Sequence, residues 1–160
     1  MPNNRNQALK RALWQKKKML HDENYRNDYI NFVNEMIAKG YARKVPEDRL
    51  ETSHGKVWYI PHHGIYHARK PQKIRVVFDC SAKYEGISLN DMLLQGPDLT
   101  NSLVGVLMRF RQDHVAFMAD IEAMFHQVRV PEEQCDFLRF LWWPDGNLEE
   151  DIQEIGRAHV

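Results

Sequence analysis

Residues 115–130 read VAFMADIEAMFHQVRV. The apolar residues 115–119 predict a buried strand, and that strand ends in a single acid, Asp120. A carboxylate taken out of water costs several kcal/mol unless a cation or hydrogen-bond donors meet it. Asp120 is therefore either a turn residue at the end of a strand or a residue held ready for a metal ion.

The alternation of this strand places Ala116, Met118 and Asp120 on one face as the chain leaves the core. Mg²⁺ takes oxygen ligands and bridges them to substrate phosphates, so a carboxylate in this position suits phosphoryl or nucleotidyl transfer. The backbone carbonyl of Ile121 would add a ligand, and Phe125 would lie beside the sugar of a bound nucleotide. The pattern is short, and a turn aspartate remains the alternative.

A basic β-hairpin is expected before this stretch. Residues 57–60 and 74–78 read as two strands, joined by a polar loop at 67–72. Alternation puts Lys73 and Arg75 on one face of the second strand, beside a loop that contains Arg69 and Lys70. Such a surface suits the phosphates of a nucleoside triphosphate or of a nucleic-acid backbone.

The remaining elements are predicted from periodicity and turn residues. Residues 8–38 read as two helices that stop at Gly40. A further helix is expected after Asp98, its cap, with an apolar stripe at Leu99, Leu103, Val106, Leu107 and Phe110. Residues 137–143 predict a strand that ends in a turn at 144–147. The order of elements predicts a mixed α+β fold.

The charges balance in number but not in position. The chain has 160 residues with 22 basic and 22 acidic side chains, yet basic residues dominate the first helix and acids dominate beyond Pro131. Two isolated cysteines, Cys80 and Cys135, indicate neither a zinc site nor a disulfide framework. No apolar run reaches the roughly 20 residues that a membrane helix needs. The isolated cysteines make an intracellular, reducing location the expectation.

Several segments, in order and spacing, resemble the reverse transcriptase of Bel/Pao long-terminal-repeat retrotransposons. They are VWYIPHH at 57–63, KIRVVFDCSA at 73–82, LNDMLLQGPDL at 89–99, ADIEAMFHQV at 119–128 and LRFLWW at 138–143. The helical lead-in that ends in GYARKVP at 40–46 is also similar, and the resemblance covers roughly residues 25–145.

The resemblance implies a truncated right-hand polymerase fold. Residues 1–24 would form a basic helical lead-in, and residues 25–154 the amino-terminal part of the reverse transcriptase domain, with fingers to about 113 and the start of the palm from 114. It also implies a cytoplasmic location, virus-like particles included, with the rest of a retrotransposon polyprotein as a partner.

The resemblance assigns roles to individual residues as well. Asp120 matches the first catalytic carboxylate, a ligand to two Mg²⁺ ions, with Ile121 adding its carbonyl, and Phe125 matches the aromatic residue that excludes a 2′-hydroxyl. Arg75 matches the fingers arginine that contacts the incoming deoxynucleoside triphosphate. The remaining candidates for the triphosphate and the RNA or DNA template-primer are Lys73, Lys70 and Arg69.

Two features depart from the family pattern. The palm motif, aromatic-x-Asp-Asp, is missing, because no Asp-Asp pair occurs in the sequence. Residues 155–160, IGRAHV, resemble the read-through of a sequencing adapter, so we expect a non-native tail. The fragment is then expected to be inactive, and the alternative is a non-catalytic nucleic-acid-binding module derived from a transposon.

Three histidines and two adjacent tryptophans are further candidate residues. His62, His63 and His67 lack a fourth ligand at regular spacing, which favours loop imidazoles over a metal site. Trp142 and Trp143 are neighbours on a predicted strand, so one is expected in the core and the other on the surface.

Overall fold

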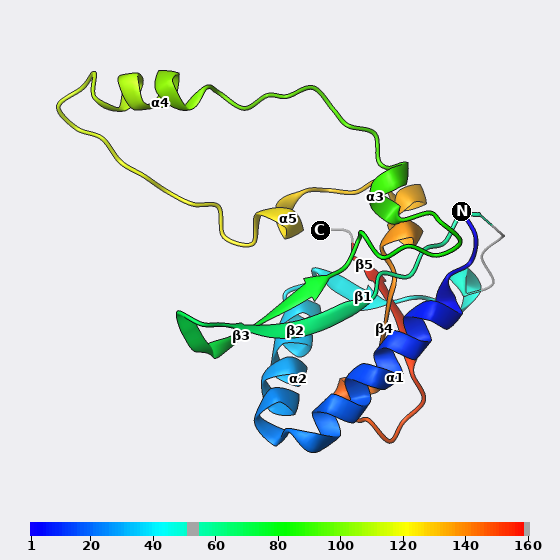
Figure 1. Cartoon of the computed structure of the whole chain (residues 1–160). Coiled ribbons are helices and arrows are strands. Elements are labelled where there is room, and N and C mark those ends of the chain that lie inside the picture. The colour runs from blue at the N-terminus through cyan, green and yellow to red at the C-terminus, as the bar shows by residue number, and fades with distance from the viewer. Residues whose placement is uncertain (51–54, 159–160) are drawn as a thin grey trace. The chain divides into compact units, whose positions relative to one another are not determined.

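The computed structural model describes residues 1–50 and 55–158, and the chain divides into two units (Figure 1). The first unit comprises Met1–Met92 and Arg129–Val160, and the second unit comprises Leu93–Val128. The first unit contains helices and strands, and the second unit contains helices. The chain is an α+β protein, as the order of elements predicted.

Two helices open the first unit, α1 (Arg5–His21) and α2 (Glu23–Ala38), which confirms the predicted helix pair. Asp22 separates them: its backbone is extended, and its carboxylate accepts a hydrogen bond from the Tyr25 amide at 2.9 Å, which caps α2. The chain leaves α2 through Gly40, whose φ of +72° is the left-handed conformation that glycine adopts without strain.

A three-stranded antiparallel sheet follows, in the order β1-β5-β4. Its strands are β1 (Ala42–Lys44), β5 (Gln153–Arg157) and β4 (Phe140–Trp142). The predicted strand at 137–143 is thus shorter than expected, because residues 137 and 138 belong to the 3₁₀ segment η2 (Glu132–Leu138). A short 3₁₀ turn, η3 (Pro144–Gly146), lies in the predicted turn.

The end of the chain contributes the middle strand of this sheet. Ile155 of β5 pairs with Lys44 of β1 and with Phe140 of β4. The boundary that the sequence placed after residue 154 therefore falls inside a strand. Residues 159 and 160 lie outside the described residues, and a non-native origin for residues 155–160 stays a prediction.

The predicted hairpin forms, but its first strand was placed wrongly. The pair consists of β2 (His62–His67) and β3 (Lys70–Phe78), antiparallel to each other (Figure 1). Residues 57–60 instead run beside the end of η2, where the Ile60 amide donates to the Arg139 carbonyl at 2.7 Å. The expected loop at 67–72 shrinks to a turn, because the pairing extends to His67 and Lys70. The segment after β1 contains the 3₁₀ turn η1 (Glu47–Arg49), and residues 51–54 lie outside the described residues.

The helices and both sheets of the first unit share one aromatic core. The ring of Tyr29 stacks on Trp142 with centroids 5.3 Å apart, and His62 lies against Phe140. Trp142 and Trp143 are both buried, which corrects the expectation that one of them faces solvent. The reason is that the turn after β4 folds back against α2, where Gly146 lies directly over Ile30.

A buried ionic cluster joins segments that are distant in sequence. The fully buried guanidinium of Arg139 donates to Asp136 and, at 2.9 Å, to Glu154. Glu154 also accepts from the Tyr59 hydroxyl at 2.8 Å and pairs with Arg5 of α1. Burial, and after it the hydrogen bond to the Glu154 carboxylate, raises the pKa of Tyr59 to about 12. The cluster links the start of α1 to β5, which lies 149 residues further along the chain.

The second unit contains two helices, α4 (Leu103–Phe110) and the short α5 (Met124–Gln127); the one-turn helix α3 (Leu89–Met92) closes the segment before it. Ser102, not Asp98, caps α4, because its hydroxyl accepts from the Gly105 amide whereas Asp98 bonds to Thr100. Residues 115–119 form no strand, which corrects the central expectation for the fold. Pairing decides this outcome, since no strand of the described residues is hydrogen-bonded to that segment.

Candidate nucleic-acid interface

The outer face of hairpin β2–β3 presents the predicted phosphate-binding residues. Lys73 and Arg75 are exposed, whereas Ile74 and Val76 between and beyond them are buried, so the predicted alternation holds. Ile65 pairs directly with Arg75 and adds an apolar side chain to the same face. Successive residues on one face of a strand are about 7 Å apart, which leaves both cations accessible to one extended ligand.

The tip of the hairpin adds two more cations. Arg69 and Lys70 are exposed, and the Arg69 amide donates to Nδ1 of His67 at 3.1 Å, which shapes the turn. Within residues 1–50 and 55–158, no ion pair involves any of the four cations Arg69, Lys70, Lys73 and Arg75. Asp79 does not neutralise them, because its carboxylate accepts from the amide and hydroxyl of Ser81.

The inner face of the hairpin is fixed to α2. The Tyr25 hydroxyl donates to the Gly64 carbonyl at 3.1 Å and accepts from the Gly64 amide at 2.9 Å, so one side chain satisfies both backbone groups. A β-carbon at Gly64 would lie 2.7 Å from that hydroxyl and from Ile74. Glycine is required here by this close approach, which sets the hairpin on the helix.

His62 fixes the base of the hairpin. Its Nδ1 is hydrogen-bonded to the Tyr29 hydroxyl and its Nε2 to the Leu141 carbonyl, at 3.0 Å for the latter. A neutral ring that donates through Nε2 and accepts through Nδ1 satisfies both bonds. Burial lowers the pKa of His62 to about 4, so the ring is neutral at pH 7. His62 packs in the core and His67 bonds to the turn, whereas His63 is exposed, and all three lie in strand β2 and not in a loop. Among the described residues there is no cluster of three or more metal-ligating side chains.

Asp120, Ile121 and Phe125 belong to the second unit, whereas Arg75 and the hairpin belong to the first. All three are exposed, with Phe125 at 82 %. In the part of the chain that the structure describes, no hydrogen bond or ion pair is formed by the Asp120 carboxylate. The structure therefore gathers the four cations on one surface of the first unit, and the metal-ligand candidates belong to the second unit.

The described residues do not by themselves fit a pair of Mg²⁺ ions. Asp120 supplies one carboxylate, and no further acid converges on it to make a metal-binding group within residues 1–50 and 55–158. Two-metal sites require several oxygen ligands held together. We derive no catalytic step from this chain alone.

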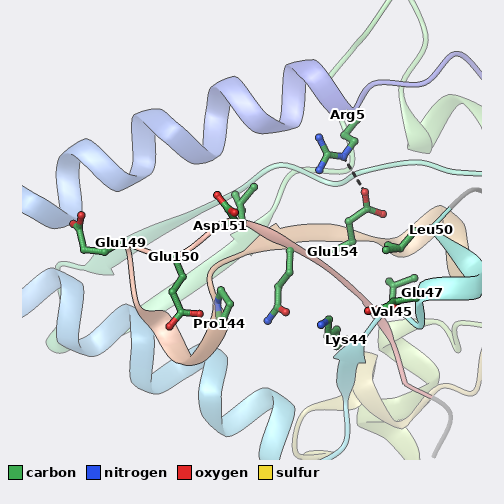
Figure 2. A pocket seen from close by; sticks show the side chains of 12 residues that line it. Arg5, Lys44, Val45, Glu47, Leu50, Pro144, Glu149, Glu150, Asp151 and Glu154 are labelled. Carbon is green, nitrogen blue, oxygen red and sulfur yellow. Dashed lines mark hydrogen bonds and ion pairs between the residues drawn. The ribbon is translucent and has the colours of Figure 1, made fainter.

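One cavity of about 660 Å³ in the first unit has the wrong charge for a phosphate ligand (Figure 2). Its wall includes the acids Glu47, Glu149, Glu150, Asp151 and Glu154. Two cations oppose them, Lys44 and Arg5, and Arg5 is already paired with Glu154 (Figure 2). An acidic wall repels phosphate, so this cavity is not the nucleotide site.

Sequence reasoning missed the residues that hold the hairpin in place. Tyr25, Gly64 and His62 are chosen by packing, and their sequence neighbourhood gives no signal of the bonds between them. A glycine inside a strand pattern was the one available signal, because it marks a close backbone approach. The ionic cluster around Arg139 was missed for the same reason, since its members are up to 149 residues apart.

Comparisons with known proteins identify no relative: no family model, no curated protein and no solved structure matches the chain. In the described part of the chain, no helix has both the length and the apolar character needed to cross a membrane.

Proposed function

We propose that this chain is the amino-terminal part of an RNA-directed DNA polymerase of the Bel/Pao retrotransposon type, and that hairpin β2–β3 is its contact with nucleotide and nucleic-acid phosphates. The observation that carries the proposal is the row of four exposed cations, Arg69, Lys70, Lys73 and Arg75, none of them in an ion pair among the described residues. The order of the resembling motifs supports the finer assignment.

The hairpin is suited to this role by its rigidity as well as its charge. Its inner face is fixed by the buried His62 and by the two hydrogen bonds between the Tyr25 hydroxyl and the Gly64 backbone, so the cations are presented by a supported strand. A charged surface held in place loses less conformational entropy on binding than a mobile tail does. Lys73 and Arg75 then contact successive phosphates, with Arg69 and Lys70 extending the surface beyond the strand end.

In this proposal the second unit supplies the chemistry only when further carboxylates join Asp120. Asp120 and the Ile121 carbonyl would be ligands of Mg²⁺ there, which would supply charge neutralisation, and Phe125 would exclude a 2′-hydroxyl. The 160-residue chain is expected to bind nucleic acid without extending a primer, because one carboxylate does not hold two metal ions.

Binding to a labelled RNA–DNA primer-template at several salt concentrations tests the hairpin. Each neutralised phosphate releases counterions, so changing Arg69, Lys70, Lys73 and Arg75 to Gln should lower the slope of log K against log salt by about 3 to 4. The matched control changes Arg26, Lys39, Lys56 and Lys83 to Gln, which removes the same charge elsewhere on the first unit. Equal slopes for the two quadruple variants would contradict the proposal.

A second candidate function, a non-catalytic nucleic-acid-binding module, is favoured by one observation: the hairpin and its supporting core belong to the first unit, whereas Asp120 belongs to the second. The two candidates differ in the genomic sequence after residue 154. An open frame that continues into aromatic-x-Asp-Asp supports the polymerase, and a stop codon there supports the module. Asp120-dependent primer extension by the purified chain would contradict the module, and also the expectation that one carboxylate is too few for activity.

A further inference from the structure

The outward face of α1 combines positive charge with one exposed aromatic ring. This helix of 17 residues carries six lysines and arginines and no acid. Three of the cations contact other parts of the first unit. Arg5 pairs with Glu154, Lys16 donates to the Leu148 carbonyl, and the Lys18 ammonium lies 3.8 Å from the centre of the Tyr25 ring.

The other three cations face solvent around Trp14. Lys10, Arg11 and Lys17 are exposed, and no ion pair involves them within the described residues. Residues three and four apart are neighbours on a helix surface. Lys10 and Arg11 precede Trp14 by four and three residues, and Lys17 and Lys18 follow it by three and four. Every helical neighbour of the indole is therefore a cation.

Trp14 itself is 71 % exposed, in contrast to Trp58, Trp142 and Trp143, which are at most 2 % exposed. An exposed tryptophan in a helix contributes little to the fold, because most of its apolar area stays in water. The opposite stripe of α1, with Ala8, Ala12 and Met19, packs into the core. The outward face is thus not needed for folding the first unit.

We propose that the outward face of α1, defined by Lys10, Arg11, Trp14 and Lys17, binds single-stranded nucleic acid by stacking a base on the indole while the surrounding cations contact the adjacent phosphates. Stacking on an aromatic side chain inside a positive surface is the physical basis of sequence-tolerant single-strand binding. Such a contact lies outside the hairpin and does not depend on the polymerase assignment.

The arrangement favours nucleic acid over an anionic membrane surface. A helix that lies in a membrane interface needs a contiguous apolar face turned outward. On α1 the outward apolar residues are split, with Leu13 and Leu20 on one flank, Trp14 on the other, and Lys10 and Lys17 between them. The core-facing stripe cannot serve, because it is already buried.

Intrinsic fluorescence provides a direct readout, because Trp14 is the exposed tryptophan among three buried ones. Titration with short oligo-dT and oligo-U should quench the Trp14 fraction of the emission, and the two probes distinguish DNA from RNA as the source. Trp14→Ala should weaken binding about tenfold, whereas Trp14→Phe should retain most of it because the ring still stacks. Leu13→Ala is the matched control, since it removes exposed apolar area on the same helix without a ring.

A charge test is made on the same face. Changing Lys10, Arg11 and Lys17 to Gln should lower the salt slope for a single strand by about 2, and changing Lys39, Lys56 and Lys83 to Gln should leave it unchanged. Circular dichroism melts of all variants should match the parent, because the changed side chains are exposed.

Two outcomes would overturn the inference. One is unaltered affinity in Trp14→Ala, or a loss equal to that of Leu13→Ala. The other is Trp14-dependent binding to vesicles of anionic lipid in the absence of any binding to the oligonucleotides. If only the hairpin variant lowers the salt slope, the proposed function stands and the inference about α1 is wrong. If only the α1 variant lowers the salt slope, the inference about α1 stands and the proposed role of the hairpin is wrong.

Discussion

Trp142 in the first unit is fully buried, whereas Phe117 in the second unit is 87 % exposed, although each belongs to an apolar run that predicts a strand. Leu141 beside Trp142 is buried as well, and Met118 beside Phe117 is 88 % exposed. The run at 115–119 is entirely apolar, whereas the run at 137–143 contains Arg139, so hydropathy does not explain why only the latter is buried. What differs is that β4 has a hydrogen-bonded neighbour, β5, and residues 115–119 have none among the described residues.

Charged residues show the same contrast. Arg139 in the first unit is fully buried among Asp136 and Glu154, and Arg111 in the second unit is exposed. A buried guanidinium is tolerated only where its donors are satisfied, and that requires elements from several parts of the chain. The comparison indicates that long-range pairing determines which apolar runs and which charges become structural.

The largest effect is expected from breaking the ionic cluster. Arg139→Ala should destabilise the chain by about 3–5 kcal/mol, because it leaves the carboxylates of Asp136 and Glu154 buried without their cation. Arg111→Ala, in the second unit, should change the free energy of unfolding by less than about 0.5 kcal/mol. Urea unfolding followed by circular dichroism measures both, and equal losses would erase the contrast between the units.

Removing core aromatics should produce a similar asymmetry. Trp142→Ala is expected to cost about 3–5 kcal/mol, since the ring stacks on Tyr29 and contacts His62. Phe117→Ala should cost less than about 0.5 kcal/mol. A large loss in the Phe117 variant would show that the second unit is packed in solution, and the comparison would then need revision.

Acid should weaken the first unit through His62. Burial lowers the pKa of this ring to about 4, against an ordinary value of 6.5, so the unfolded chain binds a proton between these pH values and the folded chain does not. Stability therefore falls as pH drops through this window, by up to about 1.4 kcal/mol for each pH unit.

Unfolding free energies across the window for His62→Gln test this assignment, because glutamine can donate to the Leu141 carbonyl and accept from Tyr29 without titrating. The pH dependence should flatten in this variant and persist in His114→Gln, a change in the second unit. A pH slope that is unaffected by His62→Gln would assign the acid sensitivity to another group.

The smallest effect separates two glycines. Gly64→Ala places a β-carbon 2.7 Å from Ile74 and the Tyr25 hydroxyl, which should cost about 1–3 kcal/mol by overpacking. Gly96→Ala, in the second unit, meets nothing within 4 Å and should be neutral or slightly stabilising, because alanine reduces the freedom of the unfolded chain. Thermal melts of both variants would show the difference, and a neutral Gly64→Ala would mean that the hairpin is not held by Tyr25.

Sequence reasoning was most successful where the determining interactions are local. The helix pair, its stop at Gly40 and the alternation of Lys73, Ile74, Arg75 and Val76 were predicted from periodicity and turn chemistry. The strands predicted at 57–60 and 115–119 do not form, because an apolar run indicates that a segment can be buried but not which strand will pair with it. The residue roles implied by the polymerase resemblance stay predictions, as do Mg²⁺ and an intracellular location.

The sequence by itself determined the helix pair α1 and α2, the turn after β4 and the exposed cations of the hairpin, since backbone preferences and side-chain alternation act over a few residues. Tertiary structure alone decided that residues 155–157 become part of the middle strand β5, that both Trp142 and Trp143 are buried, and that Arg139 is enclosed by Glu154 and Asp136. These outcomes depend on contacts between segments distant in the chain, where burial is favourable only once a partner supplies the missing hydrogen bonds and the opposite charge.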